Sequence, residues 1–259
     1  MQQRTGFIRI DSAVLAVKHI MASSPTPNDP TLIFLHEGLG SIDQWRSFPE
    51  KLVEATGLSA YIYDRQGYGK SVPFDRKRKL NYLHKEAFEV LPELIAKLKI
   101  ANPILVGHSD GATIALLYAS KFNPVCIISE AGHVHLEPFC IEGIKTAAAN
   151  RKTIVQKLEK YHHEKSESVF SAWADIWLNV EFKDWNIEDR LLQISCPTLI
   201  LQGEADEYAT LNHPNLIKNT IGQNAELAII EAAGHSPHLS HSAETLSLMT
   251  KFIQTSIAE

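Results

Sequence analysis

The stretch Gly107-His108-Ser109-Asp110-Gly111 decides the fold of this chain, because of the segments that stand on either side of it. The apolar run 103–106 before it is typical of a buried strand, and the segment 112–122 after it is typical of a helix. A strand that turns this sharply into a helix strains the backbone at the serine, and the flanking glycines remove side chains that would clash. The pattern therefore predicts an exposed serine hydroxyl at a helix N-terminus, which favours developing negative charge.

Further apolar runs alternate with helix-like segments along the chain. The runs cover residues 31–35, 60–63, 104–106, 125–128, 198–201 and 226–230. Runs that are apolar almost without interruption suit strands buried on both faces, as in a parallel sheet. The helix-like segments cover residues 43–56, 83–99, 112–122 and 243–257. This alternation predicts an α/β fold in one domain, with a doubly wound, mostly parallel sheet and an antiparallel hairpin over 6–21 at the sheet edge.

The region from about residue 135 to about residue 190 breaks this rhythm. It contains no buried-strand run, and aromatic and charged residues mix there at helical spacing. An insertion of about 55 residues is too long for a plain loop and should carry helices of its own. We expect a helical lid over one end of the sheet; the alternative is one more helical layer of the core.

Composition limits the classes of partner and location. A net charge of −5 gives no reason to expect nucleic acid or an anionic membrane as a partner. The sequence has no apolar stretch of the roughly 18 residues that a transmembrane helix needs, and its first residues lack the features of a signal peptide. Cys126, Cys140 and Cys196 show no ligand-like spacing, and two of them lie in apolar runs. We expect a cytoplasmic protein, whose oligomeric state the sequence leaves open.

The segment 107–111, in its strand-to-helix context, resembles the nucleophile elbow of the α/β-hydrolase superfamily. The resemblance covers residues 31–132 and 191–257, which is most of the chain but not the expected lid. It implies that Ser109 is the nucleophile and that a catalytic acid and then a histidine follow it along the chain. A serine hydroxyl is a poor nucleophile until a base accepts its proton, so the chemistry requires these two partners.

The resemblance places the acid and the base just after two of the apolar runs. Asp206 follows the run 198–201 and stands three residues after a glycine, as the superfamily's acid does. His235 follows the run 226–230 and comes directly after a glycine, as the superfamily's histidine does. The carboxyl ends of neighbouring parallel strands are where open α/β sheets bind ligands. Close rivals remain at the sequence level: Glu204 and Glu207 for the acid, His238 and His241 for the base.

A negatively charged oxygen on the attacked carbonyl needs two N–H donors. One is expected to be the backbone N–H of Asp110, the residue after the nucleophile, with its carboxylate pointing away. The other is expected from residues 36–40, which resemble the superfamily's His-Gly-x motif except that Glu37 stands where glycine is usual. We favour the N–H of Gly38, with Glu37 and Leu39 as alternatives. The side chain of Glu37 is either a polar contact to the substrate or a solvated group.

Two further stretches contribute to the predicted site without chemistry of their own. Residues 63–71 resemble the superfamily's Asp-x-Arg-Gly-x-Gly-x-Ser turn, in which glycines and an Asp–Arg pair brace the loops near the site. Phe170, Trp173 and Trp177 fall at helical spacing in the expected lid. Such a stripe commonly packs against the sheet, but Trp173 and Trp177, with Glu37 and Leu39, are also our candidates for the lining of the substrate pocket.

Together these residues predict acyl transfer to water through a covalent acyl-enzyme, with a small carboxylic ester or a lactone as substrate. The predicted reaction needs no metal and no organic cofactor. Because the base must be neutral, activity should rise with pH through an ordinary histidine pKa of about 6 to 7. Hydrolysis of a carbon–carbon bond and acyl transfer to another acceptor are alternatives on the same three residues. A small-molecule receptor or signalling protein that uses the pocket is an alternative of a different class.

Overall fold

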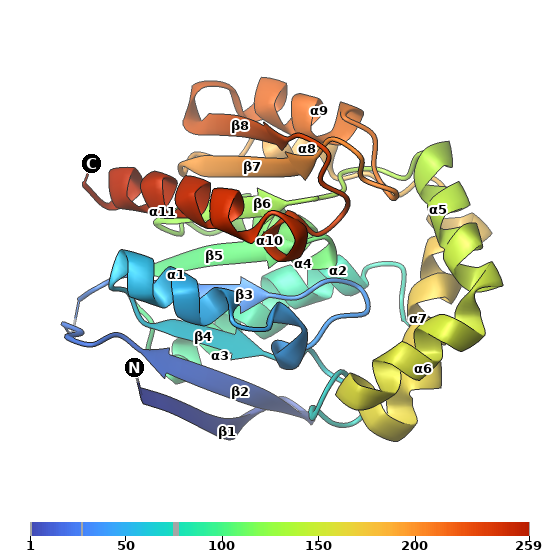
Figure 1. Ribbon diagram of the computed structural model, residues 1–259, viewed down its shortest axis with the longest axis horizontal. Helices are drawn as coiled ribbons and strands as arrows, with labels where there is room; N and C mark the ends of the chain where they lie inside the picture. Colours follow the sequence, from blue (N-terminus) through green and yellow to red (C-terminus); the bar gives the residue numbers. More distant parts are fainter. Residues whose placement is uncertain (1, 27, 75–77, 259) are drawn as a thin grey trace.

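The sheet of the computed structural model has eight strands in the order β1-β2-β4-β3-β5-β6-β7-β8, and the model describes residues 2–26, 28–74 and 78–258. Strands β3 to β8 are parallel to one another, and β2 is antiparallel to both β1 and β4. The bounds are β1 Gln2–Ile10, β2 Ala13–Met21, β3 Thr31–Leu35, β4 Ala60–Tyr63, β5 Pro103–His108, β6 Cys126–Glu130, β7 Thr198–Gly203 and β8 Ala225–Ile230. The predicted α/β fold, its mostly parallel sheet and the edge hairpin are confirmed (Figure 1).

The central strands are apolar on both faces because the sheet separates two hydrophobic cores. Ile33 and Leu35 of β3 belong to one core, whereas Leu32 and Phe34 belong to the other. Successive side chains of a strand point to opposite faces, so an uninterrupted apolar run supplies both cores at once. For this reason the apolar runs in the sequence predict the positions of the central strands.

Helices cover both faces of the sheet, as the doubly wound arrangement requires. One face carries α1 Phe48–Thr56 and α11 Ser242–Ala258, which contact each other. The other face carries α2 Tyr82–Lys85, α3 Leu91–Leu98, α4 Asp110–Ala119, α8 Glu188–Leu191 and α9 Asn212–Ile221. A 3-10 turn, Ile42–Trp45, precedes α1, and the short α10, Pro237–Ser240, precedes α11. Both cores are thereby sealed from water.

The helix predicted over 83–99 is built from three pieces. A π-helical turn, Glu86–Val90, lies between α2 and α3. Pro92 stands in the first turn of α3 and has no N–H to donate to the preceding turn. A wider π turn just before such a residue accommodates the missing bond, so the stripe of apolar residues continues while the hydrogen-bond pattern changes.

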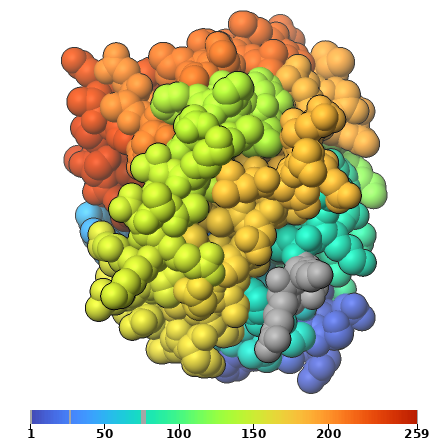
Figure 2. All heavy atoms as spheres, turned by 90° about the vertical axis from the view of Figure 1, so that its right-hand side faces the viewer, coloured from blue at the N-terminus to red at the C-terminus, as the bar shows by residue number. Residues whose placement is uncertain are grey.

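Three helices between β6 and β7 stand apart from the two layers. They are α5 Pro138–Ala149, α6 Arg151–His162 and α7 Ser166–Trp177, followed by a 3-10 turn, Val180–Phe182. Figure 1 shows them across the carboxyl ends of the parallel strands, while the start of β1 and the end of α11 lie on the opposite side. Figure 2 views this side directly, and the yellow-green and gold helices cover much of it. We call α5 to α7 the helical segment.

Among the described residues, no helix is both long enough and apolar enough to cross a membrane.

Candidate active site

Ser109 occupies a strained turn between β5 and α4. Its backbone has a φ of 55°, which is unusual for a residue other than glycine, and its N–H donates to the carbonyl of Glu130 on β6 at 2.8 Å. A Cβ at Gly107 would collide with the backbone oxygen of Gly111, and a Cβ at Gly111 would collide with that of Leu35. Only glycine fits these two positions, so the sequence pattern and the observed turn have one cause.

Asp206 and His235 form a buried hydrogen-bonded pair beside this turn. The Nδ1 of His235 lies 2.9 Å from the carboxylate of Asp206. The carboxylate also accepts from the backbone N–H of Tyr208 at 2.7 Å and from the Nε2 of Gln202 at 2.6 Å. These donors fix the carboxylate, which in turn fixes the orientation of the imidazole ring.

The charges of this pair shift both pKa values. Burial alone would raise the pKa of Asp206, but His235 and the hydrogen bonds outweigh it and lower the pKa to about 2. Burial alone would lower the pKa of His235, but the Asp206 carboxylate, with Glu37 and Glu207, outweighs it and raises the pKa above its usual range. The pair therefore favours the protonated form of His235. A general base takes that form once it has accepted a proton from the nucleophile.

The rival residues at the sequence level have other partners in the structure. Glu204 accepts from the backbone N–H of Ala232, and Glu207 accepts from the backbone N–H of His235 rather than from its ring. His238 is buried beside β6. Its Nδ1 lies 2.9 Å from the carboxylate of Glu130, and its backbone N–H donates to the same carboxylate at 2.8 Å. The geometry thus pairs the imidazole of His235 with Asp206 and with neither neighbouring glutamate.

The loop after β3 supplies the other side of the site. Glu37, Gly38 and Leu39 all line the pocket that Ser109 and His235 also line, so all three remain open as sources of the second N–H donor. The Gly38 carbonyl accepts from the hydroxyl of Tyr68 at 2.9 Å, which orients that peptide group. The N–H of Asp110 belongs to the first residue of α4 and so has no intrahelical acceptor.

The side chain of Asp110 is held by a buried cluster of polar groups. Its carboxylate accepts from both terminal nitrogens of Arg65 at 3.2 Å and from the hydroxyl of Tyr82 at 3.1 Å. Arg78 lies 4.0 Å from the same carboxylate. The expected pair between Asp64 and Arg65 is not what braces the loops: Asp64 accepts from the N–H groups of Ile42 and Lys70, whereas Arg65 binds Asp110.

The pocket above Ser109 is partly open to solvent and spans about 410 Å³ with that open space included. Trp173 and Trp177, both predicted as lining residues, reach it from α7, and Trp177 also packs in the core on that face. Residues that the sequence reasoning missed also line it; they are His133, Cys140, Ile144 and Tyr208. Tyr208 comes two residues after Asp206, and His133 comes soon after the end of β6. Their positions just after strands were the signal in the sequence that could have marked them as pocket residues.

The helical segment is attached to the loops of the site by a buried imidazole. The Nε2 of His162 lies 2.9 Å from the carbonyl of Leu39, and its Nδ1 accepts from the N–H of Gly69 at 2.9 Å. Burial lowers the pKa of His162 to about 4, so the ring is neutral at pH 7 and can make both contacts. Trp173 presses on the same loop, because a Cβ at Gly38 would lie 2.5 Å from its ring.

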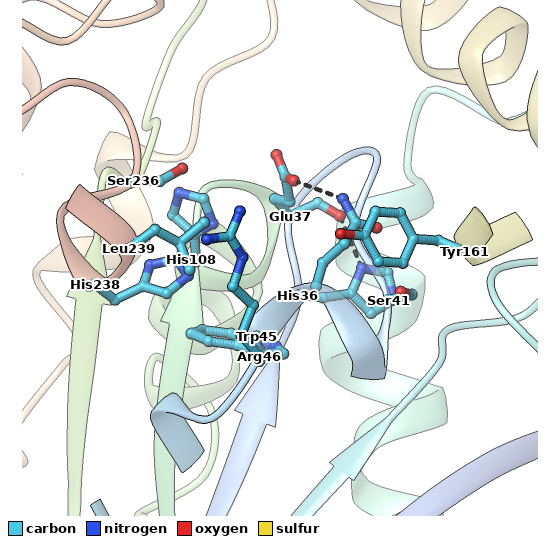
Figure 3. Close-up of a pocket in the computed structure, with 12 residues that line it drawn as sticks. His36, Glu37, Ser41, Trp45, Arg46, His108, Tyr161, Ser236, His238 and Leu239 are labelled. Carbon is cyan, nitrogen blue, oxygen red and sulfur yellow. Dashed lines mark hydrogen bonds between the residues drawn. The ribbon is translucent and has the colours of Figure 1, made fainter. Parts of the chain in front are cut away.

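A second pocket adjoins the first and shares Glu37 with it. It spans about 460 Å³, open solvent included, and is lined mainly by polar residues, among them Gln44, Arg46, His108, Tyr161 and Ser236 (Figure 3). Arg46 has a φ of 54°, which is another strained position in the loop region after β3. The site is therefore two-sided, with an aromatic pocket under the helical segment and a polar pocket next to it.

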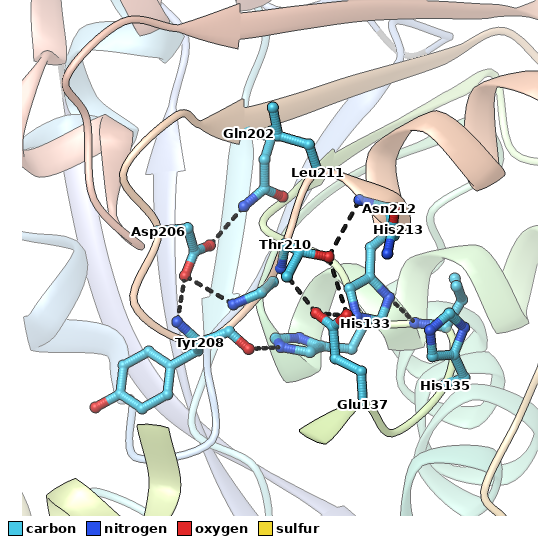
Figure 4. Close-up of polar contacts among 12 residues, drawn as sticks. His133, His135, Glu137, Gln202, Asp206, Tyr208, Thr210, Leu211, Asn212 and His213 are labelled. Atoms are coloured by element: carbon cyan, nitrogen blue, oxygen red, sulfur yellow. Dashed lines mark hydrogen bonds and ion pairs between the residues drawn. The ribbon is translucent and has the colours of Figure 1, made fainter. Parts of the chain in front are cut away.

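One group of side chains within the described residues has the composition of a metal site. The nitrogen and oxygen atoms of His135, Glu137 and His213 lie within 4.8 Å of one another (Figure 4). The Nδ1 of His213 accepts from the N–H of Val134, so its proton is on Nε2, which faces Glu137 at 3.1 Å. In that tautomer the Nε2 of His213 has no free lone pair to offer a metal ion.

Comparison with known proteins agrees with this architecture. Residues 32–248 match the model of the alpha/beta hydrolase family. The human "Serine hydrolase BPHL" is 27% identical over 252 residues, which cover 94% of this chain and 80% of that protein. The 2-hydroxy-6-oxo-6-phenylhexa-2,4-dienoate hydrolase of Burkholderia cepacia is 25% identical, with 81% of this chain and 82% of that protein covered. The enol-lactonase from Burkholderia xenovorans LB400 superposes with a TM-score of 0.74 at 14% identity, covering 96% of this chain and 100% of that one.

A doubly wound sheet with a strained serine after its central strand and an acid–histidine pair after later strands defines a hydrolase of the α/β type. The chain belongs to the alpha/beta hydrolase family, as the match over residues 32–248 shows.

Proposed function

We propose that this hydrolase cleaves a small carboxylic ester or a lactone, with Ser109 as nucleophile, His235 as base and Asp206 as the acid that orients the base. The observation that carries the proposal is the hydrogen-bonded pair of Asp206 and His235 at a pocket that Ser109 also lines. Three residues far apart in sequence converge there from the ends of β5, β7 and β8.

The proposed reaction has two halves. Neutral His235 accepts the proton of the Ser109 hydroxyl as its oxygen attacks the carbonyl carbon, and the N–H groups of Asp110 and Gly38 stabilise the resulting oxyanion. The protonated His235 then gives its proton to the leaving alcohol, and the acyl group stays on Ser109. In the second half, His235 accepts a proton from water as the water oxygen attacks the carbonyl carbon of the acyl-enzyme. His235 then returns that proton to the Ser109 oxygen as the bond to the acyl carbon breaks and the carboxylic acid leaves.

The charges around His235 support this sequence of proton transfers. The ionised Asp206 stabilises the imidazolium that forms in each half, which is the effect seen as the raised pKa of His235. Asp206 itself stays ionised, because its pKa is lowered to about 2. No step of the proposed reaction passes through a metal or an organic cofactor.

We further propose that the helical segment, within residues 135–190, works as a lid of a single domain. His162 and Trp173 tie it to the loop that bears Gly38, so its position affects the shape of the site directly. The cytoplasmic location inferred from the cysteines and the choice of Gly38 as second donor remain predictions.

A matched pair of variants tests the proposed function. Ser109→Ala should lower kcat for a short aryl ester by about 10⁴-fold or more, because the nucleophile is removed. Ser240→Ala changes an exposed serine after His235 and should leave kcat within about twofold of the wild type. Labelling of the wild type, but not of Ser109→Ala, by a fluorophosphonate would report the same hydroxyl. Unchanged ester hydrolysis by Ser109→Ala would end the proposal.

Two other functions make different predictions in the same assays. The similarity to the dienoate hydrolase of Burkholderia cepacia favours carbon–carbon bond cleavage as the second candidate, and turnover of diketone-like substrates without turnover of esters would support it. Acyl transfer would appear as product formed only when an acceptor alcohol or thiol is added. A receptor would be labelled by the fluorophosphonate and would turn over neither class of substrate.

A further inference from the structure

Glu37 places a carboxylate at the junction of the two pockets. It lines both the aromatic pocket above Ser109 and the polar pocket beside it. Among the described residues, no lysine or arginine lies within 4.0 Å of its carboxylate. Its one side-chain hydrogen bond in that part of the chain comes from the amide of Gln44, at 3.4 Å. Glu37 is only partly exposed to water, and within the described residues its carboxylate lacks the arginine or lysine partner that such a charge commonly has.

The second acidic side chain in the aromatic pocket is in the opposite situation. Asp110 is bound by Arg65 and Tyr82, with Arg78 at 4.0 Å, so its charge is already compensated. A proton on His235 would favour the ionised form of Glu37, but His235 is neutral at the moment it acts as a base. In that state Glu37, unlike Asp110, has no arginine of the described part of the chain bound to its carboxylate.

We propose that Glu37 binds a positively charged nitrogen in the leaving group of the substrate, and that the polar pocket is the site for that leaving group. The inference rests on the proposed ester hydrolysis. The aromatic pocket, with Trp173, Trp177 and Ile144, suits the acyl part, so the alcohol part lies on the other side of Ser109. Glu37 stands where these two parts of an ester meet, within reach of a group a few bonds from the scissile oxygen.

The physical state of Glu37 agrees with this role. Burial raises the pKa of Glu37, because the ionised form lacks the solvation that water would give it. An incoming cation supplies the missing partner and favours the ionised form, so binding is strengthened by relief of that penalty. Arg46 also lines the polar pocket, but its side chain is exposed, and water and salt screen its charge more than that of Glu37.

A pair of esters that differ in charge alone tests the inference. Acetylcholine and 3,3-dimethylbutyl acetate have the same shape, and one carries a nitrogen cation where the other carries carbon. The wild type should hydrolyse acetylcholine with a kcat/KM higher by about tenfold, mainly through a lower KM. Glu37→Gln keeps the shape of the side chain and should reduce the ratio to about one. Asp43→Asn, an exposed acid in the same loop region that lines neither pocket, should retain the ratio of the wild type.

Salt and competitive binding provide a second measurement that needs no variant. The preference of the wild type for the cationic ester should fall as ionic strength rises, because an ion pair is screened. Tetramethylammonium should inhibit hydrolysis of the neutral ester more strongly than 3,3-dimethylbutanol does. A ratio near one in the wild type, a preference for an anionic ester, or an unchanged ratio in Glu37→Gln would each overturn the inference. The neutral ester separates this inference from the proposed function. If the wild type hydrolyses that ester and Ser109→Ala does not, the proposed function stands even where the inference about Glu37 fails.

Discussion

The two sides of the site are built in different ways. On the sheet side, Ser109, Asp206 and His235 follow strand ends, and backbone groups of neighbouring loops hold them. On the side of the helical segment, contact with the site depends on a few long side chains, chiefly His162 and Trp173. The proposed proton transfers therefore depend on residues held by backbone contacts, whereas contact with the helical segment depends on single side chains. Under the proposed function, substitutions on the sheet side should change the rate and those on the helical side should change the choice of substrate.

The largest effect is expected on the sheet side, from Asp206→Asn. The change keeps the shape of the side chain but removes the charge that orients and stabilises protonated His235, so kcat should fall by about 10⁴-fold. Steady-state kinetics on a short aryl ester measures it. Asp184→Asn changes an exposed acid in the region after α7 and should leave kcat unchanged. A loss of less than about tenfold in Asp206→Asn would transfer the role to Glu204 or Glu207.

The pH dependence of the wild type reports the same pair. The base acts in its neutral form, so kcat/KM should rise about tenfold per pH unit below the pKa of His235 and level off above it. Because Asp206 and Glu37 raise that pKa, the midpoint should lie above the pH of about 6.5 that is typical of a free imidazole. The midpoint should move to lower pH in Asp206→Asn. A flat profile between pH 5 and 8 would contradict the proposed base.

On the helical side, His162→Ala should have an intermediate effect. The substitution leaves the Leu39 carbonyl and the Gly69 N–H without a partner, and it detaches the helical segment from the loop that bears Gly38. We expect kcat/KM to fall by about tenfold, with a drop in Tm of a few degrees. His163→Ala removes the exposed neighbouring ring and is the matched control. If the two variants behaved alike, the helical segment would not act on the site through His162.

The smallest effect on rate, and the clearest on selectivity, is expected from Trp173→Ala. Loss of the indole opens space above Gly38, so the preferred acyl chain should become longer by one or more methylene groups. Each added methylene that finds an apolar contact should change kcat/KM by about tenfold or less. A series of aryl esters of increasing acyl length measures this. Phe139→Ala, on the exposed face of α5, should leave the preference unchanged, and an unchanged preference in Trp173→Ala would show that the acyl group lies elsewhere.

Sequence alone could predict most of the sheet side, for a physical reason. Strands that are buried on both faces must be apolar at successive positions, so the runs around residues 33, 105 and 200 are visible without any structure. The turn at Ser109 requires glycine at two fixed positions, which produces a local pattern. Asp206 and His235 then follow from their places after strands and from the resemblance to a family.

The contacts of the helical side could not be predicted in the same way. His162 binds Leu39 and Gly69, which lie 123 and 93 residues away in the chain, and no local pattern marks such a contact. The pairing of Arg65 with Asp110 has the same character, since it depends on how two loops meet in space. Helical spacing indicated that Trp173 and Trp177 face one way, but the same spacing fits a core stripe and a pocket wall, and Trp177 serves both.

The start of β1 and the end of α11 lie on the side away from the helical segment, and this placement has a practical consequence. A tether attached next to either of these, whether to a resin, a sensor chip or a fused partner, points the helical segment away from the support. Immobilised protein should therefore remain open to ester probes of any size that the free protein accepts, and the two orientations can be used interchangeably.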